Sequence, residues 1–356
     1  MSSLSLGLSL LERDLVPDWL IRQRIRALLA ERLAEQEAGG PQAHQQRLSA
    51  FIDELKTSPL AINTQDANAQ HYELPTAFFQ TVLGKHLKYS SCLFDLDRPP
   101  PVKQAHWQLD EAEERMLSLT AARAGIRNGD RVLELGCGWG SLSLWMAAHF
   151  PDAAITVVSN SRTQKQHIDA TAAERGLTNL KVITCDINEL QFMAGTQFDR
   201  VVSVEMFEHL RNYQQLLQRL SSWMAPKATL FVHIFTHVLH AYPFEVRDES
   251  DWMARYFFTG GIMPSDHLLF AFQDDLRIRD HWVVDGRHYQ LTAEAWLNNM
   301  DRNRDSLMPL MAETYGADQA TRWWVYWRVF FLSCAELWGY DGGREWVVSH
   351  YLFERP

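Results

Sequence analysis

An acidic string that ends in a histidine, Glu205-Met206-Phe207-Glu208-His209, is the first candidate for chemistry in this sequence. It directly follows residues 198–204, an apolar run typical of a buried strand. Residues at i, i+3 and i+4 share one face where a segment turns helical, so Glu205, Glu208 and His209 can face one ligand. Carboxylates attract a cation, and an imidazole can accept a proton near neutral pH. The ordinary alternative is that the glutamates decorate a helix N-terminus and that the histidine packs in the core.

A glycine-rich loop, Glu134-Leu135-Gly136-Cys137-Gly138-Trp139-Gly140, is the second candidate. Gly136, Gly138 and Gly140 lie between a short apolar run and a helical stretch, where backbone N–H groups can approach a ligand. The spacing differs from that of dinucleotide sites, and Glu134 would repel a pyrophosphate. An acidic residue here suits a ligand with a free ammonium group, as in the methionine part of S-adenosylmethionine. We therefore predict that Glu134 and the three glycines bind this cofactor, although a plain strand-to-helix turn would look similar.

Two further positions fit the rest of such a cofactor. Ser159 and Asn160 end the next apolar run, and Gln164 follows one helical turn later, so these groups can hold ribose hydroxyls without a charge. Asn160 and Ser161 could equally cap the following helix. After the third run, Asp186 can accept from the adenine amine while Ile187 packs on the ring.

The elements that must position these residues alternate along the chain from Asp130 onward. Alternation of strands and helices predicts an α/β fold with a doubly wound parallel sheet. Its expected elements are strands at 131–135, 155–158, 181–184, 198–204, 228–234, 276–284 and 345–353, with helices at 141–149, 161–175, 292–311 and 318–337. Helices expected at 10–37, 45–55, 75–83 and 110–124 precede the first strand. We predict a helical cap at 1–125, a Rossmann-like core at 126–236, an inserted lid at 237–275 and core-completing elements at 276–356.

Bulk properties narrow the class of function. A formal net charge of −10 disfavours nucleic-acid or anionic-lipid partners. The chain shows neither a basic flank before its first leucine run nor an apolar stretch long enough for a bilayer, so we expect a cytoplasmic protein. The four cysteines are widely spaced, and His233, His237 and His240 lack a third ligand at a convincing spacing, so we predict no metal. A homodimer is possible on these data.

Several motifs resemble the cyclopropane-fatty-acid-synthase superfamily of class I methyltransferases, and most closely its coclaurine N-methyltransferase branch. These are His71-Tyr72-Glu73, Tyr89-Ser90-Ser91-Cys92-Leu93-Phe94, the glycine loop, Met206-Phe207-Glu208-His209, Phe272-Gln273-Asp274-Asp275 and Trp338-Gly339-Tyr340. The resemblance covers nearly the whole chain. It implies that Tyr89 and Ser90 close over the cofactor and that Ser159 and Gln164 hold it.

The two branches of this superfamily differ in chemistry. The lipid enzymes hold a bicarbonate with a Cys, a Glu, a His and a Tyr. At those positions this chain has Ser91, Glu208, about Ile234, and Phe330 or Phe331, so we expect too few bicarbonate ligands. The resemblance also places Glu205 where the lipid enzymes have a glycine.

We therefore predict an S-adenosylmethionine-dependent N-methyltransferase of a small aromatic amine, of the tetrahydroisoquinoline or phenethylamine type. His209 is the expected general base, Glu208 is expected to orient it, and Glu205 is expected to bind the cationic amine. An aromatic wall around the substrate is expected from Tyr72, Trp327, Phe330, Phe331 and Trp338, each of which could instead be ordinary core. The alternatives are a cyclopropane-fatty-acid synthase or lipid C-methyltransferase, and a cofactor-binding regulator without activity.

Overall fold

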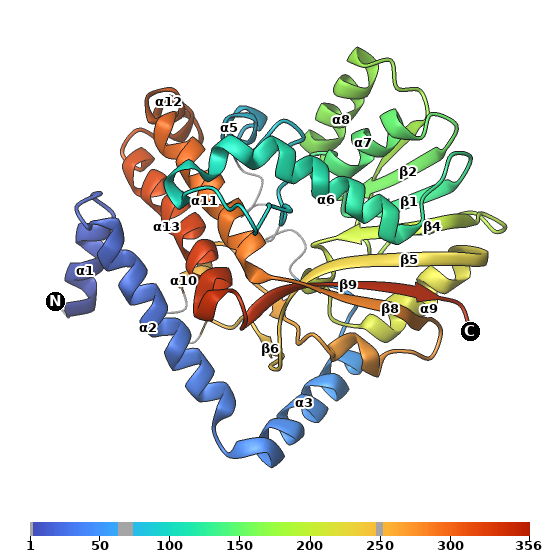
Figure 1. Ribbon diagram of the computed structural model, residues 1–356, viewed down its shortest axis with the longest axis horizontal. Helices are drawn as coiled ribbons and strands as arrows, with labels where there is room; N and C mark the ends of the chain where they lie inside the picture. The colour runs from blue at the N-terminus through green and yellow to red at the C-terminus, as the bar shows by residue number, and fades with distance from the viewer. Residues whose placement is uncertain (1–2, 63–73, 247–251) are drawn as a thin grey trace.

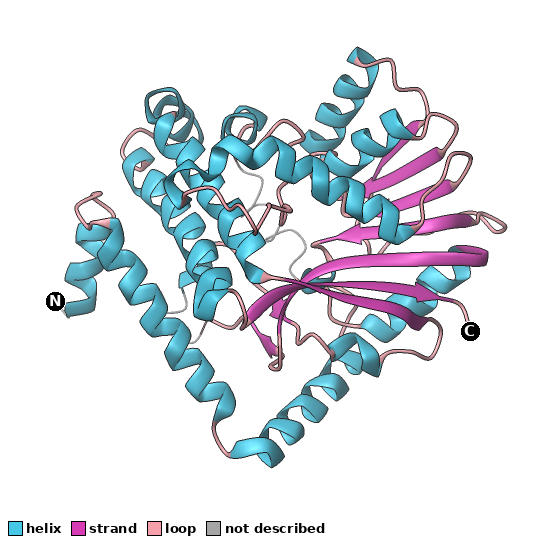
Figure 2. Ribbon diagram, viewed as in Figure 1, coloured by secondary structure: helices cyan, strands magenta, loops and turns pink. Residues whose placement is uncertain are grey.

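A computed structural model describes residues 3–62, 74–246 and 252–356, and the structural statements that follow concern this part of the chain. A twisted sheet with flanking helices occupies one half of the molecule, and a helical layer occupies the other (Figures 1 and 2). The N-terminal helices form a V-shaped arm that spans both halves.

The central sheet has seven strands in the order β3-β2-β1-β4-β5-β9-β8. They are β1 (Arg131–Leu135), β2 (Ala154–Ser159), β3 (Leu180–Thr184), β4 (Phe198–Val204), β5 (Met224–His237), β8 (Arg277–Val284) and β9 (Trp346–Glu354). The first five strands in this order pair in parallel, whereas β9 runs antiparallel to both β5 and β8. The order reverses between β1 and β4, and ligands of such sheets bind at that switch point, beyond the carboxyl ends of the strands.

Helices cover both faces of the sheet, which is why β1 is an almost continuous apolar run instead of an alternating one. One face packs against α6 (Leu109–Ala124), α7 (Ser141–His149) and α8 (Arg162–Glu174). The other packs against α3 (Gly40–Thr57) and α9 (Tyr213–Trp223).

The helical half has its own aromatic core. Its main helices are α2 (Asp18–Glu37), α5 (Thr76–Val82), α11 (Gly286–Arg302), α12 (Arg304–Tyr315) and α13 (Ala320–Gly339). Shorter elements complete the chain: α1 (Ser3–Leu11), η1 (Val102–Gln108), η2 (Phe207–His209), β6 (Tyr242–Pro243), α10 (Trp252–Tyr256), β7 (Ile262–Met263), η3 (Leu268–Ala271) and η4 (Tyr340–Gly342). Residues 237–275, the expected lid, hold the small β6–β7 pair and two of these short helices.

Several expected elements differ in extent; α3, for example, begins at Gly40 and not at residue 45. The helix expected at 10–37 is two helices, because the chain turns before Pro17, which precedes α2. The helix expected at 292–311 is also two, with a break at Asn303, whose N–H still bonds back to Asn299 and Met300. Strand β5 extends beyond the expected 228–234 at both ends, because β9 pairs with it as far as His237.

A buried ion-pair cluster attaches the N-terminal arm to the helical half. Arg22 of α2 donates to Glu294 at 2.6 Å and to Glu336 at 2.8 Å, and both carboxylates are almost fully buried. Arg26 also pairs with Glu336. Because an unpaired buried carboxylate is costly, this cluster fixes α2 against α11 and α13.

Candidate active site

Two hollows open at the carboxyl ends of β1, β2 and β4, where the sequence predicts the cofactor. The strand-end hollow has a volume of about 140 Å³, and the loop hollow beside it has about 70 Å³. Gly136, Gly138 and Glu205 line both, so the two hollows meet at these residues. The predicted residues in the strand-end hollow are Gly136, Gly138, Ser159, Asn160, Gln164, Asp186, Ile187, Glu205 and His209. Those in the loop hollow are Tyr89, Ser90, Glu134, Gly136, Gly138 and Glu205.

The glycine loop takes backbone conformations that other residues adopt at a cost. Gly136, Gly138 and Gly140 have φ values of 76°, 51° and 82°. A Cβ on Gly136 would lie 2.9 Å from the Cβ of Met206, so this position also needs its small size. Gly140 lines neither hollow and instead precedes α7 as its N-cap, packed against Ile168. The loop thus exposes the backbone of the first two glycines to the hollows.

Glu134 lies at the end of β1 in the loop hollow, where it is almost fully buried. Ser143 at the start of α7 donates to its Oε2 at 2.5 Å. Burial raises the pKa of Glu134 to about 8, against the opposing effects of Ser143 and the nearby Lys88. A buried carboxyl of this kind readily ionises when a ligand brings an ammonium group beside it.

The polar groups after β2 include one open donor. Ser159 Oγ donates to Gln164 Oε1 at 2.7 Å, whereas Gln164 Nε2 is buried with no hydrogen-bond partner in the described residues. Ser161, not Asn160, caps α8, because its side chain accepts from the Gln164 N–H. Asn160 is exposed and lines the strand-end hollow, which leaves its amide available to a ligand.

Asp186 and Ile187 follow β3 at the same sheet edge. Asp186 Oδ1 accepts from the Asn188 N–H at 2.8 Å, which fixes the turn, and Ile187 is buried. Both line the strand-end hollow.

Glu205 stands at the junction of the two hollows and accepts three hydrogen bonds. Its Oε1 accepts from the Ser91 N–H at 2.8 Å and contacts His233 Nε2 at 3.1 Å, while its Oε2 accepts from Tyr289 Oη at 2.6 Å. Its φ of 46° is in the left-handed region, a strain of about 1–3 kcal/mol that proteins hold mainly at functional sites. Burial raises the pKa of Glu205, and Lys88 is the strongest of the groups that oppose this.

The neighbouring Glu208 and His209 do not contact each other as expected. Glu208 is buried, and neither of its carboxylate oxygens has a hydrogen-bond partner in the described residues. The hydrogen bond by which Glu208 was expected to orient His209 is therefore not made in this arrangement. Burial and the nearby Glu205 raise the pKa of Glu208 well above its usual range.

His209 lines the strand-end hollow. Burial lowers the pKa of its imidazole to about 4, so the ring is neutral at physiological pH and can accept a proton. Phe258 stacks beside it at 6.4 Å between ring centroids.

The expected aromatic wall lies deeper than the hollows. Trp327, Phe330, Phe331 and Trp338 are buried in the core of the helical half, and none of them lines the strand-end or loop hollow. Trp338 stacks on Tyr289 at 3.8 Å, so it supports a group that holds Glu205. Core packing therefore accounts for these four positions, and Tyr72 lies outside the described residues.

Several site residues were not predicted from the sequence. His233 of β5, Tyr289 of α11 and the Ser91 N–H all bond to Glu205, and the expectation that β5 presents Ile234 to this site is wrong. Lys88 is fully buried beside the loop hollow and donates to Ser90 Oγ at 2.5 Å. The signal available for Lys88 was its place directly before the Tyr-Ser pair.

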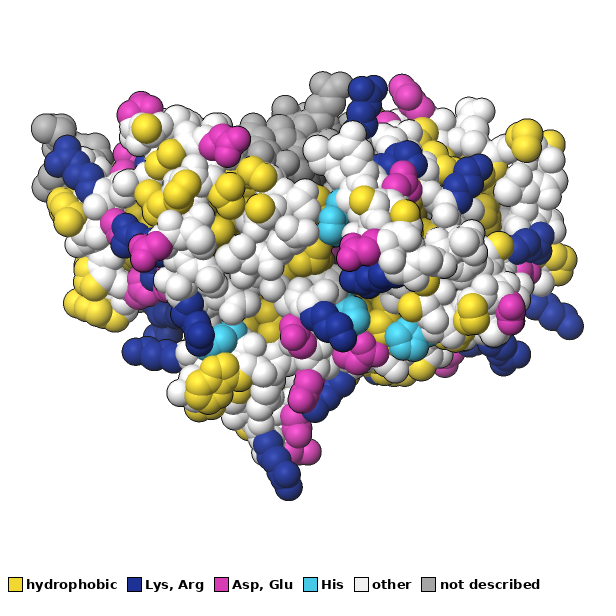
Figure 3. Space-filling view, turned by 90° about the horizontal axis from the view of Figure 1, so that it is seen from above, with side chains coloured by type: hydrophobic (Ala, Val, Ile, Leu, Met, Phe, Trp, Pro, Cys, Tyr) yellow, Lys and Arg dark blue, Asp and Glu magenta, His cyan; other side chains and the backbone are white. Residues whose placement is uncertain are grey.

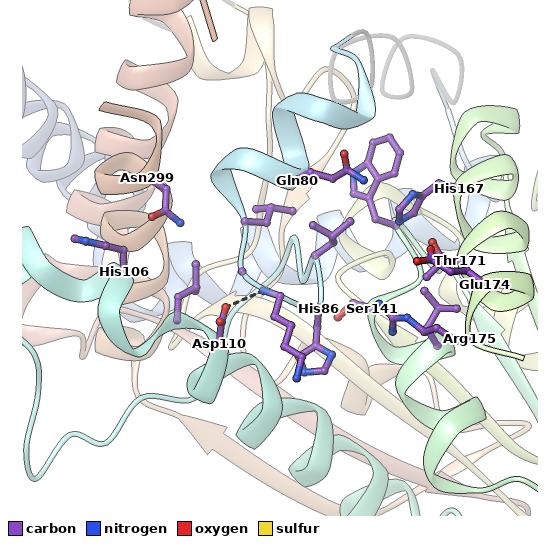
Figure 4. A pocket seen from close by; sticks show the side chains of 17 residues that line it. Gln80, His86, His106, Asp110, Ser141, His167, Thr171, Glu174, Arg175 and Asn299 are labelled. Atoms are coloured by element: carbon purple, nitrogen blue, oxygen red, sulfur yellow. Dashed lines mark hydrogen bonds between the residues drawn. The ribbon is translucent and has the colours of Figure 1, made fainter. Parts of the chain in front are cut away.

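A larger pocket of about 580 Å³ lies outside the sheet edge (Figure 4). His106 and Asn299 lie at one end, and His167, Thr171, Glu174 and Arg175 lie at the other (Figure 4). Within its lining, Asp110 accepts from the Lys85 N–H, and His86 pairs with Glu114. We assign the chemistry to the two smaller hollows, because Glu134, Glu205 and His209 line them and not the larger pocket.

The described residues contain no group of three or more His, Cys, Asp or Glu side chains placed to hold a metal ion. Within the same residues, no helix combines the length and apolar character needed to cross a bilayer. On the face seen in Figure 3, acidic and basic side chains are intermixed.

Comparisons with known proteins agree with this geometry. Residues 61–337 match the family model described as mycolic acid cyclopropane synthetase. The chain is 36% identical over 352 residues to (S)-coclaurine N-methyltransferase from Thalictrum flavum subsp. glaucum, covering 97% of this chain and 94% of that protein. It is 36% identical over 351 residues to the protein of the same name from Papaver somniferum, covering 97% and 96%.

A solved structure shares the whole architecture. The crystal structure of coclaurine N-methyltransferase bound to N-methylheliamine and SAH matches with a TM-score of 0.93 at 34% identity, covering 99% of this chain and 100% of that one. This match confirms the predicted class I methyltransferase fold.

Proposed function

The chain belongs to the mycolic acid cyclopropane synthetase family, and we propose that within it this protein methylates the nitrogen of a small cyclic aromatic amine. It is an S-adenosylmethionine-dependent N-methyltransferase, as predicted from its resemblance to the coclaurine branch. The names of its relatives, which include pavine N-methyltransferase, support an alkaloid of the tetrahydroisoquinoline type as the substrate.

The residues around the two hollows fit the cofactor. Glu134 would pair with its ammonium group, the Gly136 and Gly138 backbone would approach its methionine part, and Ser90 would close the loop hollow. Ser159, Asn160 and the open Nε2 of Gln164 would hold the ribose, with Asp186 and Ile187 at the adenine. Bound there, S-adenosylmethionine supplies a methyl group that passes to the amine lone pair as the carbon–sulfur bond breaks.

Glu205 would dock the amine. A secondary alkylamine has a pKa near about 10 and is mostly a cation at neutral pH, so it needs a carboxylate partner. A carboxylate offers about four acceptor positions, and Glu205 already accepts three hydrogen bonds, which leaves one at Oε2 for an ammonium group. The bonds from Ser91, His233 and Tyr289 hold this acceptor in place.

His209 would then take the proton. Its neutral ring lines the same hollow as Glu205, so it can accept the hydrogen of the docked ammonium and free the lone pair for attack. Glu208 is buried without a hydrogen-bond partner in the described residues, and its raised pKa favours the neutral form in the empty site; it would ionise as positive charge enters and then stabilise the imidazolium through that charge. Alignment of nitrogen, methyl carbon and sulfur would supply much of the remaining rate enhancement.

The observation that carries this proposal is the hydrogen-bonded Glu205 carboxylate at the junction of the hollows. The Glu205 carboxylate is hydrogen-bonded to His233 and to the Ser91 N–H, two groups that could otherwise bind an external anion. Such an arrangement favours a cationic substrate over a bicarbonate-assisted lipid reaction.

The test is a mass-spectrometric assay of S-adenosylmethionine with tetrahydroisoquinolines, phenethylamines and unsaturated phospholipid vesicles. We expect N-methyl products from cyclic aromatic amines and no change in the lipid. Glu205→Gln and His209→Ala should each lower kcat/KM by about 100-fold or more, with cofactor affinity unchanged. Methylation of lipid acyl chains without amine turnover would contradict the proposal, and equal activity in both variants would remove the assigned roles.

A further inference from the structure

We propose that Arg123, His350 and His233 form a polarised hydrogen-bond relay that holds the Glu205 carboxylate ionised and in position. They would be positioning residues, since none of them lines the strand-end or loop hollow. This inference rests on the proposed role of Glu205 in docking the amine.

Three contacts connect Glu205 to Arg123, which is only half-buried. Arg123 Nη1 lies 2.6 Å from His350 Nδ1, His350 Nε2 lies 2.9 Å from His233 Nδ1, and His233 Nε2 lies 3.1 Å from Glu205 Oε1. Arg123 is in the last turn of α6, and its guanidinium lies 4.7 Å from the centroid of the Trp282 ring. The relay therefore joins a half-buried cation to the buried carboxylate.

Sheet register produces this alignment. His233 of β5 pairs directly with His350 of β9, and on its other side it pairs with Val204, the last residue of β4. The Glu205 N–H continues this pattern by donating to the His233 carbonyl at 2.8 Å. Paired residues of neighbouring strands project on the same face, so the two imidazoles lie in one row that points at Glu205.

The guanidinium fixes the direction of every bond in the row. Arginine only donates, so His350 must accept at Nδ1 and carry its hydrogen at Nε2. His233 must then accept at Nδ1, which places its own hydrogen on Nε2, pointing at Glu205. Burial lowers the pKa of both imidazoles well below the usual range, so each ring is neutral and can accept on one side while donating on the other.

Without the guanidinium, the row could reverse. Both rings could then take the other tautomer, and His233 Nε2 would accept a hydrogen from a protonated Glu205. The neutral carboxyl cannot dock a cation. The relay thus opposes burial, which favours the protonated form of Glu205.

Other groups also face Glu205 and set the background for any pH effect. Lys88 acts from the loop before Ser90, His209 and Glu208 act from η2, and Tyr289 acts from α11. All of these remain in place when the relay is changed at its far end, so a variant of Arg123 isolates the relay.

The test compares the acid limb of the kcat/KM profile for a tetrahydroisoquinoline in four variants. Arg123→Met removes the guanidinium, whereas His350→Leu breaks the row and keeps the guanidinium. Both variants should move the acid limb to higher pH by about half to one pH unit. Arg123→Lys, which still donates, should restore the wild-type limb. Arg304→Met is the matched control, because it removes another cation that lies over a tryptophan, Trp324.

A second readout needs no turnover. In protein labelled with ¹⁵N-histidine, long-range ¹H–¹⁵N correlation should show His233 and His350 as neutral Nε2–H tautomers in the wild type. His350 should lose that tautomer in Arg123→Met. Wild-type profiles in Arg123→Met, or Nδ1–H tautomers in the wild type, would overturn the relay. If no amine is methylated, the proposed function is overturned instead. The tautomers of His233 and His350 would still test the relay in that case.

Discussion

The charge state of Glu134 gives the sharpest quantitative prediction about cofactor binding. Burial raises its pKa to about 8 in the ligand-free site, so below that pH the carboxyl is mostly protonated. Pairing with the cofactor ammonium requires the ionised form, and binding must then release a proton. Affinity should therefore rise with pH, whereas a preformed carboxylate with an ordinary pKa would give a constant affinity over the same range.

The magnitude follows from the same shift. With a pKa of about 8, the Kd for S-adenosylhomocysteine should fall about tenfold between pH 6 and pH 7, or about 1.4 kcal/mol. Glu134→Gln should abolish this slope and weaken binding by about 10- to 100-fold at pH 8, since it removes a charge-assisted hydrogen bond.

Titration calorimetry at several pH values measures both effects, and Glu174→Gln on the exposed side of α8 is the control. The control should keep the wild-type slope. A pH-independent Kd in the wild type, or an unchanged slope in Glu134→Gln, would refute the reasoning.

Three further predictions concern stability and amine uptake. Gly140→Ala should destabilise the ligand-free protein by about 2–4 kcal/mol in urea unfolding, because a positive φ is combined with a Cβ placed 2.6 Å from an α8 side chain. Gly138→Ala, with positive φ but no atom within 4 Å, should cost about 1–2 kcal/mol, and equal losses would contradict the packing argument. Arg22→Met should cost about 3–5 kcal/mol by leaving the buried Glu294 unpaired, although Arg26 still pairs with Glu336, whereas Arg24→Met on the exposed side of α2 should cost about 1 kcal/mol or less in the same assay. Amine binding should release protons, because an incoming cation favours ionisation of Glu208, whose pKa burial and Glu205 raise well above its usual range; calorimetric heats that do not change with buffer ionisation enthalpy would contradict this.

Much of the fold could be predicted because its signals are local. Strands β1 and β4 and helix α7 have the expected bounds, since each is a short apolar run beside punctuating glycines or polar residues. The break at Asn303 could not be predicted, because the polar residues 301–306 include no proline or glycine that would mark the end of a helix. The ends of β5 depend on its pairing with β9, a contact between segments more than a hundred residues apart.

The candidate site, like the fold, could be predicted only where its signals are local. The glycine loop and the Glu205 string carry local spacing signals, and both lie at the expected sheet edge. The partners of Glu205 come from β5, α11 and the loop before α6, so no spacing rule connects them. His233 was considered only as a possible metal ligand, because its relation to Glu205 depends on strand register. The aromatic side chains of α13 give the same pattern whether they face a substrate or a core, and only packing distinguishes the two.

The most direct measurement of the central proposal is a crystal structure of the protein with S-adenosylhomocysteine and a tetrahydroisoquinoline. We expect the amine nitrogen about 3 Å from the free position on Glu205 Oε2, within reach of His209 and facing the cofactor sulfur. An amine bound with its nitrogen away from both side chains, at full occupancy and in an enzyme that methylates it, would contradict this account.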